Sequence, residues 1–356
     1  MKKTLLLILI SCLLVLSGCA NNSGNREDES PEQAEKPETT VVRLALNGAG
    51  HIFNGIAEAQ GYLAEEGITV EYVHVTTDAE VFEGLRNGTI DIASNSGTNL
   101  PLEEISKGMN LTIFAGYLLT GCMPVFSLVD TEWKGLESLI GKTVACEPNL
   151  FALTGPLLDM GYDPLNDINW YETENQIERI EAVKNGQADF ALVGTALNQQ
   201  VTEDPQLKIV TYAADVLPAY SCCRVEAMTS WVNSNPNTIK ALLRAWIRAM
   251  DYYEGHHEEA VALTMKQTGN DEETVRAYLD NPRHELNIDP MKKSVERAWN
   301  YMERLGLLED SLRINIDRHI NTQLYKEALD ECLKRYGQDS VKFYERLQAQ
   351  YALNNY

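Results

Sequence analysis

One helix-turn-strand unit occurs twice in this chain, and this repeat restricts the fold more than any other feature. The stretch EGLRNGTIDIA at residues 83–93 aligns with EAVKNGQADFA at residues 181–191. In both copies an Asn-Gly pair ends a helical pattern, and an apolar strand pattern follows. Strand, loop, helix and strand patterns precede each copy at nearly the same offset. The repeat therefore predicts two α/β lobes on one plan, each a βαβαβ unit with right-handed crossovers.

The first lobe begins with a strand, a glycine-bearing loop and a helix. Apolar residues from Val41 to Leu46 predict the strand, and Asn47 and Gly48 open the loop. Apolar residues then recur at helical spacing from Ile52 to Leu63, and Gly67 stands where a left-handed C-cap is expected. Backbone N–H groups at such a helix start can bind a polar or anionic group. The same loop is also a common βα turn, so both interpretations stay open.

The N-terminus has the layout of a secretory signal. Lys2 and Lys3 precede an apolar run from residue 5 to residue 16 that is too short to span a bilayer. The sequence Leu-Ser-Gly-Cys that ends at Cys19 resembles the lipobox of bacterial lipoproteins, which implies cleavage after residue 18 and lipidation of Cys19. An ordinary signal with a chance cysteine is the alternative. Residues 19–40 carry almost no large apolar side chain, so we expect a disordered tether.

Charge and cysteine content exclude several function classes. The net charge of −22 argues against nucleic acid as a partner. Once the signal and Cys19 are set aside, five of the seven cysteines remain, widely spread and without the paired spacing of a zinc site: Cys122, Cys146, Cys222, Cys223 and Cys332. We therefore expect no metal. Export would permit a disulfide, but the spacing identifies no pairing.

Two segments are too long for one ordinary strand and are the natural crossings between the lobes, namely residues 111–129 and 220–232. They divide the chain into a first lobe of residues 41–120 and 230–356 and a second lobe of residues 121–229. The chain beyond residue 236 is helical in pattern, and its last helix, at residues 341–351, is expected to be exposed.

Several stretches in this order resemble the extracytoplasmic solute-binding proteins of ABC transporters. The nearest set is the nitrate/sulfonate/taurine and thiamine-pyrimidine (NMT1/THI5-like) family. The likeness rests on AEAQGYLAEEGI at residues 57–68, NGTIDIA at 87–93, LESLIGKTV at 136–144, and the helix and turn at 241–262. The resemblance implies a type II periplasmic-binding fold, an α/β architecture in which two lobes joined by two crossing strands close a cleft on a solute. These motifs are structural and do not identify the ligand.

In open α/β lobes ligands bind beyond the carboxyl ends of the parallel strands, which here selects four loops and the two crossings. The predicted ligand-binding residues are Asn47, Gly48, His51, Asn54, Ser94, Asn95, Ser96, Tyr117, Cys122, Asn149, Gly194, Thr195, Cys222 and Arg224. Other interpretations remain, because the polar residues at 94–96 could equally cap the following helix and Asn47 could bond its own turn.

The second crossing carries the sharpest pattern, Tyr-Ser-Cys-Cys-Arg at residues 220–224. Arg224 could offer a fork of donors to a carboxylate, sulfonate or phosphate, or it could pair with a surface carboxylate. Strand alternation predicts that Cys222 and Arg224 share one face. THI5-like pyrimidine synthases carry a longer cysteine run at this place, and this departure argues against a metal-dependent synthase. Adjacent cysteines are also common as small packing residues.

These features favour a lipid-anchored receptor that captures a small polar solute and delivers it to a membrane permease with its ATPase. We expect an extracytoplasmic monomer held at the cell membrane by its lipid, with no cofactor and no catalytic residues. One alternative is an exported THI5-like enzyme using His51 with Cys222 and Cys223, and another is a ligand sensor. Aromatic side chains near the predicted cleft favour a pyrimidine-type thiamine precursor, whereas Arg224 favours an anion such as a sulfonate or nitrate.

Overall fold

The computed structural model describes residues 35–46, 50–120, 123–194 and 197–356, apart from the side chains of Asn95 and Leu119. Residues Lys36 to Tyr356 form one compact unit. The predicted signal, the lipid site at Cys19 and most of the tether lie outside the described residues, so they stay predictions. Across the described ranges, no helix combines the length and the apolar character needed to cross a membrane.

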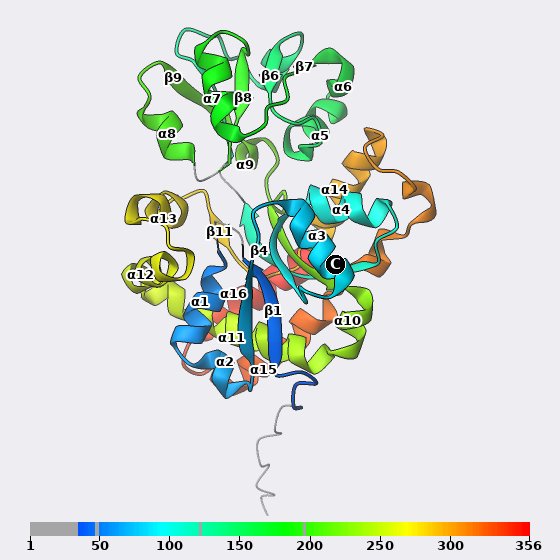
Figure 1. Ribbon diagram of the computed structural model, residues 1–356, viewed down its shortest axis with the longest axis vertical. Coiled ribbons are helices and arrows are strands. Elements are labelled where there is room, and N and C mark those ends of the chain that lie inside the picture. Colours follow the sequence, from blue (N-terminus) through cyan, green and yellow to red (C-terminus); the bar gives the residue numbers. More distant parts are fainter. Residues whose placement is uncertain (1–34, 47–49, 121–122, 195–196) are drawn as a thin grey trace, which may run out of the picture. The chain divides into compact units, whose positions relative to one another are not determined.

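The first lobe is built around two small sheets (Figure 1). Strands β1 (Val41–Leu46) and β2 (Thr69–His74) pair in parallel. A four-stranded sheet has the order β11-β4-β10-β3, with the bounds Glu285–Leu286, Leu111–Thr120, Cys223–Met228 and Ala93–Gly97. Leu44 of β1 bridges to Ile92 immediately before β3, which connects the two sheets. The second copy of the repeat, by contrast, forms a single sheet.

The second sheet contains five strands in the order β7-β6-β8-β5-β9. Their bounds are Asn169–Trp170, Thr143–Ala145, Phe190–Leu192, Pro124–Leu128 and Leu207–Tyr212. Strand β6 is parallel to β7 and β8, and β5 is antiparallel to β8 and β9. The parallel part matches the predicted plan, and β5 runs in the opposite direction to its neighbours β8 and β9.

The sheets to which β4, β5 and β10 belong show where the chain crosses from one sheet to the other. Strand β4, which ends at Thr120, lies in the four-stranded sheet, and β5, which begins at Pro124, lies in the five-stranded sheet. Strand β10 pairs with both β3 and β4. The sequence analysis assigned residues 223–228 to the second lobe, whereas the hydrogen bonds of β10 join them to the first. The division into lobes otherwise stays a prediction.

The Asn-Gly turns end their helices as predicted. Helix α3 (Asp78–Asn87) is followed by Gly88 at φ +75°, and α7 (Gln176–Lys184) by Gly186 at φ +70° after Asn185. These left-handed conformations strain residues that carry a Cβ atom, which explains the glycine at each turn. The helix predicted from Ile52 is interrupted, because a left-handed residue at position 61 separates α1 (Ile52–Ala59) from α2 (Tyr62–Glu65).

The remaining helices cover the sheets. In the first copy and the second lobe they are α4 (Asn99–Ser106), η1 (Leu136–Leu139), α5 (Phe151–Asp159), α6 (Pro164–Asp167), α8 (Asn198–Glu203) and α9 (Ala213–Val216). Beyond β10 they are α10 (Thr229–Ser234), α11 (Pro236–Gly255), α12 (His257–Thr268), α13 (Glu272–Leu279), α14 (Lys292–Arg304), η3 (Ser311–Arg313), η4 (Ile316–His319), α15 (Gln323–Tyr336) and α16 (Val341–Asn355).

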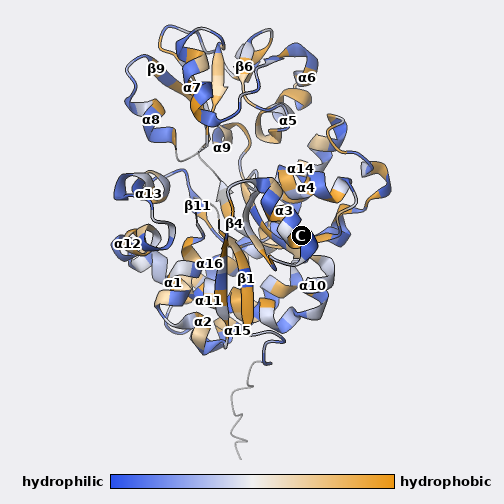
Figure 2. Ribbon diagram, viewed as in Figure 1, coloured by the Kyte–Doolittle hydropathy of each residue, from blue (hydrophilic) through white to orange (hydrophobic). Residues whose placement is uncertain are grey.

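Helix α11 forms the centre of the first-lobe core. Its apolar side chains, among them Leu242 and Trp246, are buried where the helix packs against α1, α2 and α15. Figure 2 shows hydrophobic residues concentrated on the central strand β1. The expectation that the last helix is exposed was wrong. Helix α16 buries Phe343, Leu347 and Tyr351 in the same core, because its apolar residues recur at helical spacing.

The end of the predicted tether contacts the folded unit. The Glu38 carboxylate accepts hydrogen bonds from the backbone N–H groups of Asn237 and Thr238, at 3.1 and 2.8 Å. These are first-turn N–H groups of α11, which have no partner within the helix. The hydrogen bonds hold the pKa of Glu38 below its usual value although burial acts to raise it. The tether predicted to reach residue 40 is therefore ordered from about Glu38 onward.

Candidate functional site

His51 begins the helix that follows β1, and its ring is fully buried. The ring lies 4.4 Å from Tyr117 on one side and 4.4 Å from Trp246 on the other, measured between centroids. Its Nδ1 accepts a hydrogen bond from the backbone N–H of Asn54. Burial lowers the pKa of His51 to about 3, so the ring is neutral and its proton lies on Nε2. Within the described part of the chain that Nε2 has no hydrogen-bond partner.

Asn54 is the centre of a buried hydrogen-bond network. Its Oδ1 accepts from Trp246 Nε1 at 3.0 Å, and its Nδ2 donates to the Tyr72 hydroxyl at 2.7 Å. Gln267 Nε2 on α12 donates to the same hydroxyl at 3.0 Å. The network joins α1, β2, α11 and α12. The geometry thus gives Asn54 a positioning role for the neighbouring His51 ring, and its predicted contact with ligand stays a prediction.

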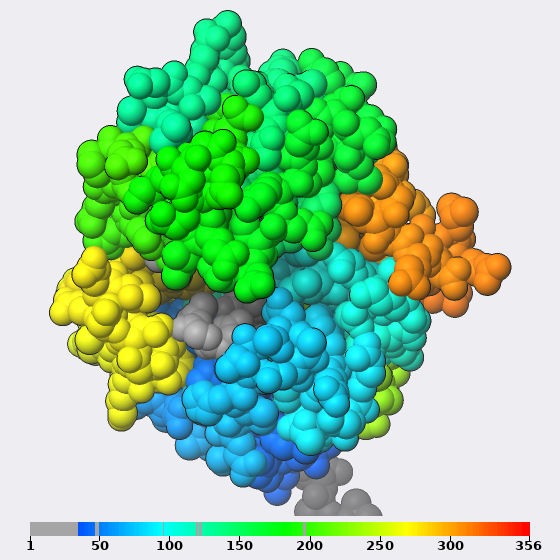
Figure 3. All heavy atoms as spheres, turned by 45° about the horizontal axis from the view of Figure 1, so that its top comes forward, coloured from blue at the N-terminus to red at the C-terminus, as the bar shows by residue number. Residues whose placement is uncertain are grey.

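Tyr117, on the crossing strand β4, lies between two aromatic groups. Its ring stacks on His51 and, at 6.4 Å, on Tyr278 of α13. Burial raises the pKa of both tyrosines, so both hydroxyls are neutral at pH 7. Tyr278 in turn contacts His284 edge to face, 5.0 Å between centroids. Figure 3 shows the surface of α12 and α13, in yellow, beside the green surface that includes α8 (Asn198–Glu203).

Strand β10, which pairs with β3, contains a buried acid that was not predicted from the sequence, Glu226. Ser94 donates to the carbonyl of Ala45. In the pairing of β10 with β3, Glu226 lies opposite Ala93, and the buried Ser96 lies opposite Arg224. Burial raises the pKa of Glu226 to about 8, an effect that Ser96 and Arg224 oppose. The Ser96 hydroxyl lies near this carboxyl without meeting hydrogen-bond geometry, and among the described residues neither Glu226 oxygen has a hydrogen-bond partner. At neutral pH the group is mostly a carboxylic acid, able both to donate and to accept.

Arg224 is also buried, but its guanidinium is directed into the chain. Nη1 donates to the carbonyls of Asp289 and Pro290, at 3.1 and 3.0 Å, and Nη2 to that of Leu118 at 3.2 Å. Burial lowers its pKa to about 10, so the charge persists at pH 7. A Cβ atom at Gly116 would lie 2.7 Å from Nη1, which explains the glycine beside it. This geometry corrects the expectation that the guanidinium is open to a ligand.

The expectation that Arg224 faces a ligand rested on regular strand alternation, and this alternation is broken at the start of β10. The pairing of β10 with β4 shifts register between Cys223 and Arg224. The Sγ atoms of Cys222 and Cys223 lie 3.6 Å apart instead of on opposite faces. Both cysteines are partly exposed. Of the other predicted site residues, Asn47, Gly48, Cys122, Thr195 and the side chain of Asn95 lie outside the described residues.

Two predicted residues belong to the second lobe. Asn149 Nδ2 donates to Glu103 Oε1 of α4 at 2.8 Å, which places this loop against the first lobe. The Gly194 N–H donates to Gln176 Oε1 at 2.6 Å. Nearby, Arg179 pairs with Glu147 and donates to the carbonyl of residue 192, which fixes the ends of β6 and β8 relative to each other.

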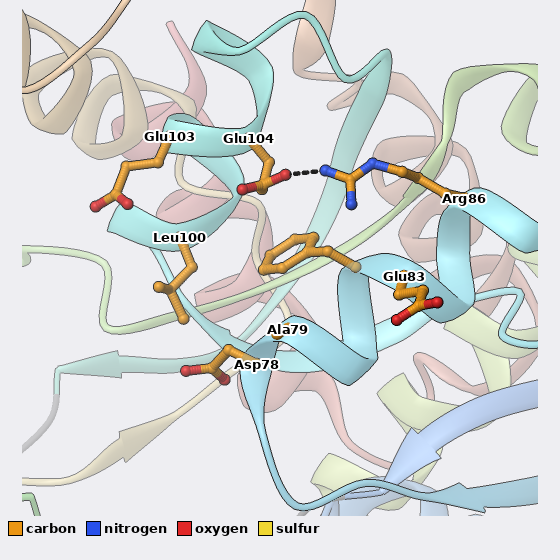
Figure 4. A pocket seen from close by; sticks show the side chains of 8 residues that line it. Asp78, Ala79, Glu83, Arg86, Leu100, Glu103 and Glu104 are labelled. Carbon is orange, nitrogen blue, oxygen red and sulfur yellow. Dashed lines mark hydrogen bonds and ion pairs between the residues drawn. The ribbon is translucent and has the colours of Figure 1, made fainter. Parts of the chain in front are cut away.

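An acidic pocket of about 570 Å³ lies beside the Asn149 contact, between α3 and α4. Figure 4 shows Glu104 paired with Arg86, while Glu103 points away from that pair. Burial raises the pKa of Asp78 and Glu103. Across the ranges described above, no group of three or more His, Cys, Asp or Glu side chains is arranged to hold a metal ion.

Sequence reasoning missed Tyr278 and Gln267 because α12 and α13 carry no motif. Trp246 was visible as part of an apolar stripe, but nothing in the stripe indicated a contact with His51. A signal for Glu226 did exist, since it is an acid within the apolar strand CRVEAM.

The chain is similar to known proteins both in sequence and in fold. The family model described as NMT1/THI5 like matches residues 49–260. The formylaminopyrimidine-binding protein of Halalkalibacterium halodurans is 24% identical over 294 residues, which cover 76% of this chain and 81% of that protein.

Two solved structures share the fold. The periplasmic aliphatic sulphonate binding protein SsuA from Escherichia coli has a TM-score of 0.65 at 16% identity, over 80% of this chain and 93% of that one. The periplasmic nitrate-binding protein NrtA from Synechocystis PCC 6803 has a TM-score of 0.66 at 17% identity, over 83% and 90%. These likenesses confirm the predicted periplasmic-binding fold.

Proposed function

This chain belongs to the NMT1/THI5-like family, and from that premise we propose that it is the solute-binding receptor of an ABC importer. The observation that carries the proposal is the match to a formylaminopyrimidine-binding protein over most of both chains. The fold shared with sulfonate- and nitrate-binding proteins supports the same role. The receptor captures a small polar solute between its lobes and delivers it to a permease.

The ligand that the site supports best is a pyrimidine-type heterocycle. In the stack of His51, Tyr117 and Tyr278, we place a flat ligand ring against Tyr278, because the other two rings are buried by their neighbours. A protonated Glu226 can donate to a ring nitrogen and accept from an exocyclic amine, and His51 Nε2 supplies an unused donor. The anion alternative rested on Arg224, whose two Nη atoms are occupied by backbone carbonyls, which leaves only the buried Nε without a partner among the described residues. These contacts favour the heterocycle over a sulfonate or nitrate.

A binding role also accounts for the site better than catalysis. A general base works best when its pKa lies near the working pH, and burial lowers that of His51 to about 3. Its Nδ1 is engaged by the Asn54 backbone. We therefore propose a receptor rather than an enzyme. We also propose that it is an extracytoplasmic monomer held to the membrane through a lipid on Cys19, as the sequence predicts.

Calorimetric titration of the purified chain with formylaminopyrimidine, an alkanesulfonate and nitrate tests the ligand class. Of the three compounds, we expect only the pyrimidine to bind. We also expect it to be recovered chemically unchanged after long incubation with the protein. At a hundredfold excess over the dissociation constant the ligand adds about 2.7 kcal/mol, which raises the melting temperature by a few degrees. Binding of the sulfonate or nitrate alone would reverse the assignment, and conversion of the pyrimidine would restore the enzyme alternative.

Uptake by cells tests the importer role separately. Cells with and without the chain are given labelled formylaminopyrimidine, and the variant Glu226→Leu, which removes the hydrogen-bonding carboxyl, serves as a binding-site change. We expect uptake to fall when the chain is removed and to fall in proportion to the loss of affinity in the variant. If the purified protein binds the label but cells that lack the chain take it up normally, the result would point to the sensor alternative.

A further inference from the structure

Cys222 and Cys223 lie side by side at the start of β10, with their Sγ atoms 3.6 Å apart. We propose that they form a reversible redox pair that closes to a vicinal disulfide by exchange with a small-molecule disulfide. The site goes beyond solute binding and does not depend on the identity of the solute. Neither cysteine is in a disulfide and both are partly exposed, whereas Cys146 and Cys332 are buried.

The backbone before the pair explains why the two sulfurs meet. Consecutive side chains of a regular strand point to opposite faces, so neighbouring sulfurs require a distorted backbone. Ser221 has φ +62° and Ala219 has φ +51°, both rare for residues with a Cβ atom. The register shift after Cys223 adds a second irregularity. These features hold the sulfurs together on one side of the chain.

Contacts from the opposite loop fix this backbone. The Thr98 N–H donates to the Cys222 carbonyl at 3.0 Å, and the Thr98 hydroxyl donates to the carbonyl of Ser221. Thr98 stands at the start of α4, directly after the predicted binding loop at residues 94–96. A change of backbone at the cysteine pair is therefore transmitted to that loop through Thr98.

The arrangement gives the two thiols different roles. The S–H of Cys223 donates to the sulfur of Cys222, and this hydrogen bond lowers the pKa of the Cys222 thiol against the effect of burial. The pKa of the Cys223 thiol is raised by the same contact and by burial. The thiolate is the attacking species in exchange, so Cys222 is the nucleophile that reacts first.

The reaction balances as two exchanges. The Cys222 thiolate attacks one sulfur of the small disulfide, forms a mixed disulfide and releases one thiol, which takes up the proton that Cys222 lost. Cys223 then loses its proton and attacks Cys222 Sγ, forming the vicinal bond and releasing the second thiol, which takes up that proton. Two protein thiols are oxidised and one small disulfide is reduced.

The product should be easily reduced again. Consecutive Cα atoms lie about 3.8 Å apart across a trans peptide bond, below the span of about 4.4–6.8 Å usual for disulfides. Deviations of this kind strain the bond and favour its reduction. A strained disulfide suits a reversible response to the surroundings better than a permanent structural link.

Peptide mapping tests the proposal directly. The full exported chain is reduced, freed of reductant, incubated with oxidised glutathione, alkylated in denaturant and digested with trypsin. Cleavage after Lys208 and Arg224 yields a peptide of residues 209–224 whose two cysteines are Cys222 and Cys223. We expect this peptide to lose two hydrogen atoms and resist alkylation, and dithiothreitol to reverse both changes. The peptides with Cys146 and Cys332 should stay alkylatable throughout and serve as internal controls.

Two serine variants test the order of attack. In Cys223→Ser the mixed disulfide between glutathione and Cys222 should accumulate, because no second thiol resolves it. In Cys222→Ser the remaining Cys223 should react more slowly with glutathione disulfide. A peptide of residues 209–224 that remains fully alkylatable after oxidation overturns the proposal. So does a linkage of Cys222 to a cysteine in any other peptide.

Discussion

The backbone N–H of Ile52, the first residue of α1, donates a hydrogen bond to the hydroxyl of Tyr117 on β4 over 3.1 Å. Both residues are almost fully buried. Helix N-termini leave N–H groups without partners inside the helix, and here a crossing strand supplies one acceptor. The hydrogen bond ties the start of α1, where His51 is held, to the strand that leads toward the second sheet.

Removing that acceptor should weaken the fold while leaving the aromatic stack in place. In Tyr117→Phe the ring is kept, but the buried N–H of Ile52 loses its partner, at a cost of about 1–3 kcal/mol. Urea unfolding measures the loss. Tyr171→Phe is the matched control, since Tyr171 is 37% exposed and should change the free energy of unfolding little. Equal stability of the two variants would mean that the hydrogen bond contributes nothing net.

The Asn-Gly turns of the two lobes should respond alike to a methyl group. Gly88 and Gly186 have positive φ, and a Cβ atom at either position meets nothing within 4 Å. Gly88→Ala and Gly186→Ala should therefore each lose about 1–2 kcal/mol from backbone strain alone. Gly255 is also free of neighbours but lacks a positive φ, so Gly255→Ala should not destabilise. Three equal melting temperatures would contradict this account.

The repeat and its turns could be predicted because their signals are local. Glycine at a helix end depends on neighbours in the chain, and α3, α7 and β8 appear where expected. The strand expected at residues 90–93 instead runs from Ala93 to Gly97 as β3, so residues 94–96 lie in a strand and not in the predicted loop. For α16 the spacing of the apolar residues is a local signal of a buried face, but the helices that cover this face could not be predicted in this way. The contact of α16 with α15 and α14 depends on residues far apart in the sequence.

The candidate site was likewise predictable only where its signals are local, and not where it depends on contacts between distant segments. His51 was found because it follows the first strand, but its burial between Tyr117 and Trp246 joins three distant segments. Arg224 was given the wrong orientation because strand alternation assumes a regular ladder, and the β10 ladder shifts register next to it. The pocket at α3 and α4 likewise depends on tertiary packing.

Glu226 should make stability fall as the pH rises. Its pKa is about 8 in the folded chain against an ordinary value of 4.5. Between these values the folded state holds a proton that the unfolded state has lost, so the stabilising effect is complete below pH 4.5 and is lost as the pH rises toward 8. Asp78 and Arg224 are the charged groups that act on it, in opposite directions.

Comparison with Glu226→Gln isolates this effect, because glutamine imitates the protonated acid and does not titrate. We expect the variant to gain stability relative to the natural chain as the pH increases from 5 to 8.5, by on the order of a few kcal/mol. Urea midpoints at several pH values provide the measurement. Parallel curves for the two proteins would show that Glu226 titrates normally in the folded state.

Cys19 should determine how the exported chain is held. If the predicted lipidation occurs, Cys19→Ser releases the protein from the membrane fraction into the soluble one, as cell fractionation and blotting would show. Cys12→Ser is the control, because that cysteine lies within the predicted signal and is removed with it. A Cys19→Ser protein that stays with the membrane would contradict the anchor.

Arg224 distinguishes a structural role from a ligand contact. Its Nη atoms bind three backbone carbonyls, and these carry β4 and the segment before α14. Arg224→Met keeps much of the side-chain volume but leaves buried carbonyls without donors, each at about 1–3 kcal/mol. The free energy of unfolding should fall well beyond that of Arg283→Met, a control whose side chain is 39% exposed.

If Arg224 instead contacts the ligand, as the sequence predicts, then Arg224→Met should affect binding and not stability. A guanidinium that faced the cleft would be needed for binding and not for folding, so Arg224→Met would keep its melting temperature and lose affinity by more than tenfold. The geometry predicts a lowered melting temperature, with formylaminopyrimidine affinity near normal at temperatures where the variant remains folded. Arg224→Lys should recover little stability, because one ammonium cannot reach carbonyls on both sides as the planar guanidinium does. Melting curves with and without the pyrimidine separate the two roles.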